Sequence, residues 1–244
     1  MRTMKSSNPA LSVFDKVQHQ ASAIPMTIQG TVNKSILLLL LVVLTASITW
    51  GLANAGNNIA YPLMIIGVIG GLITAFVAIF AINTIHITAP LYALFEGLFL
   101  GGISATFANF YKGIVFQAVI ITFTVFGVML LLYKFRIIQA TATFKKILLL
   151  ATVSIAVYYL VSIVLRLFGI DISVFAMGTM GLVIQVVIVV IAALNFILDF
   201  NFIEQGSAQG LPKKMEWYGS FSLLVTLIWL YLEILRLLAL LSRR

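Results

Sequence analysis

Three acidic residues lie in stretches of this sequence that are otherwise apolar, and they are the side chains best placed to do chemistry. Glu96 occurs in LYALFEGLFLGG, Asp199 in NFILDFNFIE and Glu233 in WLYLEILRLL. An ionisable group costs about 3 kcal/mol to place in hydrocarbon, so each of these acids is a candidate functional residue. Two carboxylates that meet in a low-dielectric setting share a proton, so Asp199 and Glu233 together predict a proton-sensitive latch.

Each acid also has a plainly structural interpretation. Glu96 can serve as a protonated carboxyl group bonded to a neighbouring helix. Asp199 can be an ordinary residue at the membrane interface, and Glu233 can pair with Arg236, three residues later on the same helix. The sequence leaves both interpretations open, because it does not show whether the side chains of Asp199 and Glu233 touch.

The remaining acids are predicted to have ordinary roles. Arg166 and Asp171 flank a short connection between two apolar runs, which predicts an interfacial ion pair. Glu204 and Glu216 lie in a polar stretch broken by glycine and proline, which predicts solvated side chains in a loop over residues 201–216.

The composition sets the fold class. Of the 244 residues, 62% are hydrophobic and only 9% are charged, which excludes an ordinary soluble domain. Runs apolar on every face predict helices that cross a membrane, not the alternating strands of a β-barrel. We therefore predict an all-α polytopic membrane protein, a seven-transmembrane-helix bundle whose short connections make consecutive helices antiparallel neighbours. The predicted spans are residues 35–53, 60–82, 87–110, 113–133, 146–168, 173–199 and 218–241.

The distribution of charge predicts the domain organisation and the orientation. Residues 1–34 form a polar tail, and residues 35–244 form the transmembrane domain. Most lysines and arginines fall on the side of the N-terminus, which predicts a cytoplasmic N-terminus. The net charge of +8 is then a topology signal and does not indicate nucleic-acid binding. Arg243 and Arg244 fall on the opposite side, so the side of the C-terminus stays open.

No enzyme motif is apparent in the sequence. The patterns GxxxxGK[ST], HExxH and GxSxG are absent, and two histidines without any cysteine do not suggest a zinc site. We therefore predict a protein that is not an enzyme and needs no cofactor. The pairs Gly70-Gly71 and Gly101-Gly102 predict close packing between helices.

The order and spacing of these features resemble those of the Bax inhibitor-1 family, in its bacterial branch. The resemblance covers residues 30–244 and rests on FEG at 95–97, the acid that ends the sixth span, and LYLEILRLLALL at 230–241. It implies a bundle with the last helix central, in a bacterial inner membrane, that passes calcium ions as a pH-sensitive leak. It also implies that Asp199 and Glu233 form the proton sensor and offer oxygen ligands to calcium, with Glu96 along the ion path.

The sequence departs from the family pattern at the latch. The seventh-helix acid is glutamate where the family usually has aspartate, and residues 60–82 lack the arginine that supports the latch in some members. Arg236 or Arg166 is the candidate replacement. An alternative function is a non-conducting protein that binds other membrane proteins, such as a membrane protease, through residues 1–34 and 201–216. The expected partners are otherwise the lipid bilayer and calcium ions.

Overall fold

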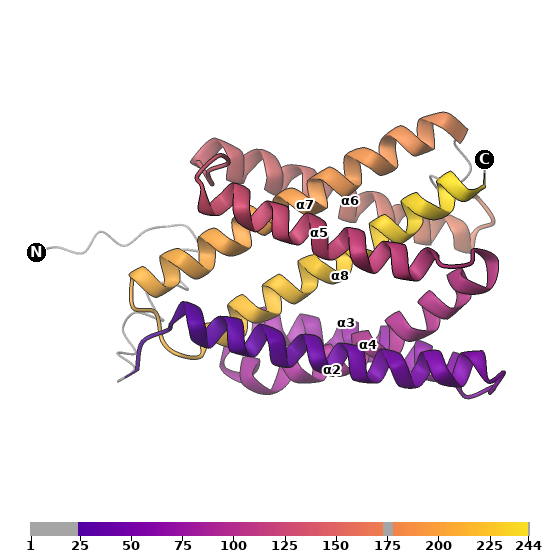
Figure 1. Cartoon of the computed structure of the whole chain (residues 1–244), viewed down its shortest axis with the longest axis horizontal. Coiled ribbons are helices and arrows are strands. Elements are labelled where there is room, and N and C mark those ends of the chain that lie inside the picture. Colours follow the sequence, from indigo (N-terminus) through magenta and orange to yellow (C-terminus); the bar gives the residue numbers. More distant parts are fainter. Residues whose placement is uncertain (1–23, 173–177, 244) are drawn as a thin grey trace, which may run out of the picture.

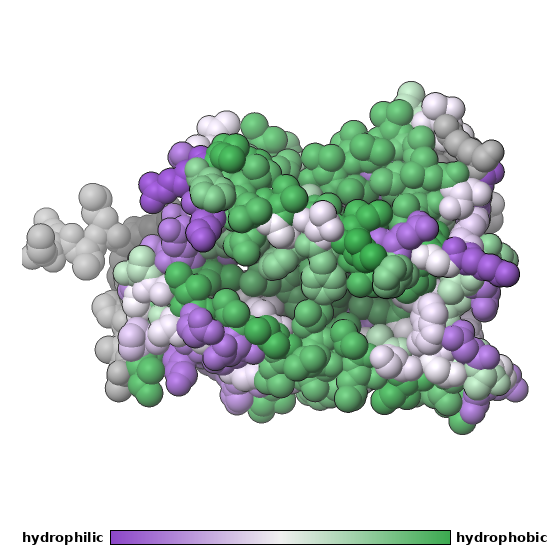
Figure 2. Space-filling model, in the orientation of Figure 1, coloured by the Kyte–Doolittle hydropathy of each residue, from purple (hydrophilic) through white to green (hydrophobic). Residues whose placement is uncertain are grey.

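The computed structural model describes residues 24–172 and 178–243, and this part of the chain is helical without any strand. Seven of its helices are long and apolar enough to cross a membrane, which confirms the predicted all-α fold of an integral membrane protein. The face of the molecule shown in Figure 2 is broadly apolar. The elements, shown in Figure 1, are α2 (Ile28–Asn54), α3 (Ala60–Phe80), the 3₁₀ turn η1 (Ile82–Thr84), α4 (Ile85–Phe110), α5 (Ile114–Lys134), α6 (Ala142–Leu167), α7 (Gly178–Ala208) and α8 (Met215–Ser242).

Two helix boundaries differ most from the sequence-based expectation. Helix α2 begins at Ile28, inside the predicted tail, because the Thr27 side chain caps it by accepting a hydrogen bond of 2.9 Å from the Gly30 N–H. Helix α7 continues to Ala208 and includes Gly206, so the predicted loop over residues 201–216 is wrong. The connection spans only residues 209–214, since helical hydrogen bonds satisfy the preceding backbone.

Two predicted regions fall partly outside the described residues. They are the first 23 residues of the polar tail and residues 173–177 at the start of the sixth predicted span. The part of the tail that the structure describes, residues 24–27, lies against the connection between α7 and α8. There the Met26 N–H donates a hydrogen bond of 2.6 Å to the Leu211 carbonyl, and Pro25 bridges to Pro212.

Helix α8 is the central helix of the bundle, as the family resemblance implies. It packs against α2, α4, α5 and α7, and it is more buried than any other span. Figure 1 shows it running obliquely between a group formed by α2, α3 and α4 and a group formed by α5, α6 and α7. The side chains of its residues therefore meet both groups.

Consecutive helices are not always the main neighbours. Helix α4 packs extensively on both α2 and α3, whereas α2 and α3 make few contacts with each other. Glycines explain this arrangement and confirm the predicted close packing. A Cβ on Gly67 of α3 would lie 2.6 Å from the Phe95 carbonyl oxygen of α4, and one on Gly101 of α4 would collide with the Ala46 carbonyl of α2.

The group on the other side of α8 packs differently. Phe126 of α5 lies edge-on to Phe196 and Phe200 of α7, with ring centroids 5.1 and 5.7 Å away. Helix α6 is the least buried span, and its main neighbour is α7. It is held partly by polar contacts, including the Asn195 amide, which donates a hydrogen bond of 3.0 Å to the Thr152 hydroxyl.

Candidate functional site: buried carboxylates along the central helix

Asp199 joins α7 to α8. Its side chain is 7% exposed, and its carboxylate accepts hydrogen bonds from the Ser222 hydroxyl and, at 2.6 Å, from the Thr226 hydroxyl. Ser222 and Thr226 are one helical turn apart, so they present two hydroxyls on the same face of α8. Tyr218, one turn earlier, is the titratable side chain of α8 that faces the carboxylate. Asp199 is thus a buried acid held by neutral donors and not an ordinary interfacial residue.

Glu233 joins three helices at a second point. Its side chain is 1% exposed, and its carboxylate accepts hydrogen bonds from the Tyr159 hydroxyl of α6 at 2.8 Å and the Gln185 amide of α7 at 2.8 Å. From its own helix, the Trp229 indole N–H donates at 2.9 Å and Arg236 forms an ion pair at 3.2 Å. The carboxylate therefore holds α6 and α7 against α8.

Arg236 is the basic partner of Glu233. The guanidinium group also lies over the Tyr159 ring, 4.8 Å from its centroid. The pairing of Glu233 with Arg236 on the same helix, left open by the sequence, is what the structure shows. Arg166, the other candidate partner, is exposed near the end of α6 and forms no ion pair with Asp199 or Glu233 among the described residues.

The two carboxylates do not contact each other, so they do not form the predicted shared-proton pair. Of the two α8 residues that bind Asp199, Thr226 is the nearer to Glu233 in the sequence. Glu233 follows it seven residues later. That spacing is about 10 Å along a helix axis. The structure thus places a hydroxyl pair, and not the second acid, opposite Asp199.

The geometry also argues against a calcium site made by Asp199 and Glu233 together. Calcium takes 6–8 oxygen ligands, whereas both Glu233 oxygens already accept hydrogen bonds from protein donors. Within the described ranges there is no group of three or more His, Asp or Glu side chains that could hold a metal ion.

Glu96 lies at a different helix contact. Its carboxylate is beside the Tyr92 hydroxyl, one turn earlier on α4, and a Cβ on Gly71 of α3 would lie 2.9 Å from its Oε1 atom. Glu96 is therefore at the contact between α3 and α4. The structure does not bring it together with Asp199 and Glu233, which face α6, α7 and α8.

Sequence reasoning missed two polar groups. Gln185 is completely buried, and its Oε1 atom has no hydrogen-bond partner among the described residues. An amide inside the apolar run GLVIQVVIVV was the available signal. Glu216 was expected to be solvated but is 2% exposed, because the Thr27 N–H, the Thr27 hydroxyl and the Lys34 ammonium all donate to it. Glu204 is exposed, as expected, and accepts a hydrogen bond from the Tyr133 hydroxyl.

A bundle of seven membrane-spanning helices around a central last helix, with buried acids on that helix and its neighbour, defines a class of polytopic membrane protein. Comparison with family models gives a match over residues 8–243 to the family described as Bax inhibitor 1 like. The chain belongs to that family. Comparisons with curated proteins and with solved structures gave no match.

Proposed function

We propose that this protein passes calcium ions across the membrane as a leak that responds to pH. Support for this function comes from membership of the Bax inhibitor 1 like family, together with the burial of two acids at contacts of the central helix. The observation that carries the proposal is the Asp199 contact, where a buried carboxylate is held by two hydroxyls of α8.

The proposed sensor is a pair of separate contacts and not one shared proton. An ionised carboxylate only accepts hydrogen bonds, whereas a protonated one carries a donor and loses acceptor capacity. A change of protonation at Asp199 would therefore weaken the contact between α7 and α8 and shift the balance between closed and open forms. The titratable or charged groups that face these acids are Tyr218 at Asp199, and Tyr159 and Arg236 at Glu233.

We further propose that the protein lies in a bacterial inner membrane with its N-terminus in the cytoplasm. The start of α2, the end of α5 and the start of α8 share one end of the bundle (Figure 1). That end carries most of the basic residues near the spans, as cytoplasmic ends do. They include Lys34, Lys134, Arg136, Lys145, Lys146, Lys213 and Lys214.

The test is calcium flux into liposomes that contain the purified protein, measured across a range of external pH. Asp199→Asn should flatten the pH dependence, because the amide cannot ionise but keeps the size of the side chain. Glu233→Gln should change the dependence as well. Glu204→Gln, at an exposed acid on the same helix as Asp199, is the matched control and should behave as the wild type. Equal flux through wild type, variants and protein-free vesicles would refute the proposal.

The alternative role as a non-conducting interaction protein receives less support. Its two expected contact surfaces are the N-terminal tail and the segment before α8. Where the structure describes them, these two segments lie against each other. The Met26 side chain is 2% exposed and Leu211 of the connection is also 2% exposed, because the two segments pack together. Partner binding that depends on residues 209–214, combined with silent liposomes, would favour the alternative.

A further inference from the structure

A long groove follows α8 between α2 and α5. Helix α2 packs on α4 and α8, and α5 packs on α7 and α8, so α8 forms the floor between them. A cavity of about 940 Å³ occupies one end of this groove and a second of about 420 Å³ continues it. Both are lined by Leu39, Phe123 and Leu227. Figure 2 shows the recess, with apolar walls, between the two groups of helices.

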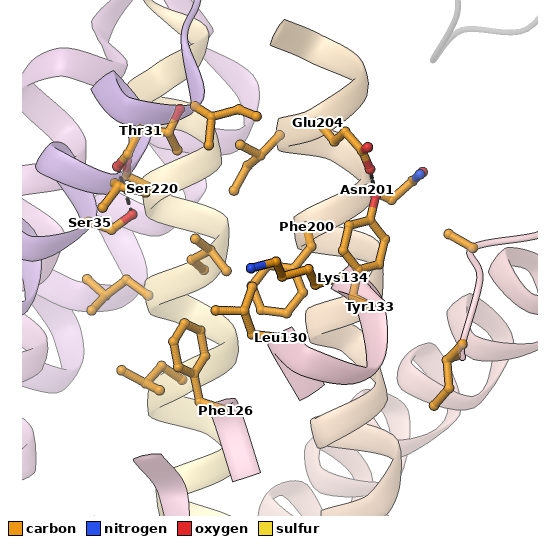
Figure 3. Close-up of a pocket in the computed structure, with 18 of the residues that line it drawn as sticks. Thr31, Ser35, Phe126, Leu130, Tyr133, Lys134, Phe200, Asn201, Glu204 and Ser220 are labelled. Carbon is orange, nitrogen blue, oxygen red and sulfur yellow. Dashed lines mark hydrogen bonds between the residues drawn. The ribbon is translucent and has the colours of Figure 1, made fainter. Parts of the chain in front are cut away.

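One end of the groove is basic. Lys134 reaches from the end of α5 into the larger cavity toward α8, beside Phe200 and Tyr133 (Figure 3). Arg136 follows in the turn after α5 and also lines this cavity. Among the described residues, neither the Lys134 ammonium nor the Arg136 guanidinium has a hydrogen-bond or ion-pair partner.

The balance of charge at this end favours an anion. Two basic side chains line the larger cavity, whereas Glu204 is its only acidic lining residue within the described ranges. The Glu204 carboxylate is already engaged by the Tyr133 hydroxyl (Figure 3). A calcium ion entering here would meet an excess of positive charge, so the groove does not suit the proposed ion path. A ligand with an anionic group attached to an apolar chain fits this groove. The anionic group suits the basic end, and the apolar chain suits the apolar walls.

We propose that the groove binds an anionic phospholipid, with the phosphate at Lys134 and Arg136 and an acyl chain along α8. The apolar walls lie between two membrane-spanning helices, so a lipid can enter sideways from the bilayer. The cavity volume lies in the range of about 300–1,000 Å³ that is usual for small-molecule sites. Basic residues close to the membrane surface attract anionic headgroups, which places the phosphate at the basic end of the bundle. This site is independent of the acids proposed to sense pH.

The first test measures lipid affinity. The purified full-length protein is titrated in detergent with dioleoyl phosphatidylglycerol or with dioleoyl phosphatidylcholine, and bound lipid is counted by native mass spectrometry. The wild type should prefer phosphatidylglycerol, and the double variant Lys134→Gln/Arg136→Gln should bind it roughly tenfold more weakly. Lys145→Gln/Lys146→Gln is the matched control, because it removes the same charge at the same end of the bundle but outside the cavity lining.

Two outcomes of that titration would overturn the proposal. Equal binding of the two lipids by the wild type would show that the headgroup charge is not recognised. An equal loss of binding in both double variants would show diffuse attraction to the basic end instead of a site.

The second test locates the acyl chain. Phosphatidylglycerol with a photoactivatable group in its chain should label residues that line the groove, among them Leu39, Phe123 and Leu227. Leu227→Trp should reduce that labelling, because the larger side chain fills the groove. A thermal unfolding transition like that of the wild type shows that this variant is folded. Labelling spread over the outer faces of α3 and α6 would refute the assignment. Cross-links that place this chain's own N-terminal segment or a second copy of the protein in the groove would refute it as well.

Discussion

The two groups of helices on either side of α8 are held together by different means. In the group of α2, α3 and α4, glycines let α4 approach both neighbours until backbone meets backbone, as at Gly67 and Gly101. In the group of α5, α6 and α7, aromatic rings fill the space and polar side chains make specific links, as Tyr159 and Gln185 do at Glu233. The first group is held mainly by close packing at glycines, and the second is linked to α8 by hydrogen bonds that a proton can change.

This difference indicates which part of the molecule can move. At Gly67 and Gly101 backbone lies against backbone, and Glu96 is the acid at the contact between α3 and α4; we expect the close glycine contacts to keep α2, α3 and α4 together as one unit. The contacts of α6 and α7 with α8 include Asp199 and Glu233, whose hydrogen bonds depend on their charge. A pH-dependent opening would then displace α6 and α7 relative to α8 and leave the glycine-packed group in place.

The largest effect is expected from a single methyl group in the glycine-packed contact. Gly101→Ala places a Cβ against the Ala46 carbonyl of α2, and the helices must separate to admit it. The free energy of unfolding, measured by denaturant titration in detergent micelles, should fall by roughly 3 kcal/mol. Gly127→Ala in α5 is the control, because beyond its own stretch of helix backbone its Cβ would have no atom within 4 Å; it should leave stability unchanged or raise it. Equal effects at both sites would mean that the two groups are packed alike.

A smaller loss is expected at the polar contact around Glu233. Glu233→Leu removes the acceptor for the Tyr159 hydroxyl, the Trp229 indole and the Gln185 amide. Side-chain hydrogen bonds between membrane helices contribute about 0.6 kcal/mol each, so the loss should be roughly 2 kcal/mol.

The movement of α6 in that variant can be measured directly. The chain contains no cysteine, so spin labels at Leu160 of α6 and Leu241 of α8 can be introduced without background. The distance distribution between them should broaden in Glu233→Leu and stay narrow in Gly101→Ala. Broadening in neither variant would contradict the idea that Glu233 holds α6 in place.

Asp199→Ala should cost less, about 1 kcal/mol, because only two hydrogen bonds are lost. The freed hydroxyls of Ser222 and Thr226 can turn to backbone carbonyls of their own helix, which limits the loss. Comparing unfolding in Asp199→Ala and in Ser222→Ala/Thr226→Ala tests the origin of the effect. A much larger loss in the serine–threonine variant would show that the hydroxyls act elsewhere.

The sequence was sufficient to predict the helices but not the partners that the acids find on other helices. Long apolar runs and glycine pairs determine spans and close packing locally, so the seven helices and the close packing at Gly101 could be predicted. The partners of Asp199 depend on how α7 and α8 are rotated about their axes, which no local pattern specifies. Burial of Glu216 depends on residues 24–27 folding back onto the start of α8, a contact between parts of the chain about 190 residues apart.

The smallest effect is expected at Glu204, and it tests whether burial is what distinguishes the other acids. Glu204 lies on α7 only five residues after Asp199 and also bonds a side chain of another helix, Tyr133 of α5. Its side chain is exposed, so in Glu204→Gln the amide oxygen or water can accept the hydrogen bond of the Tyr133 hydroxyl. The free energy of unfolding should change by less than about 0.5 kcal/mol. A change as large as that of Asp199→Ala would mean that any acid bridging two helices matters equally, and the case for a sensor at the buried acids alone would be lost.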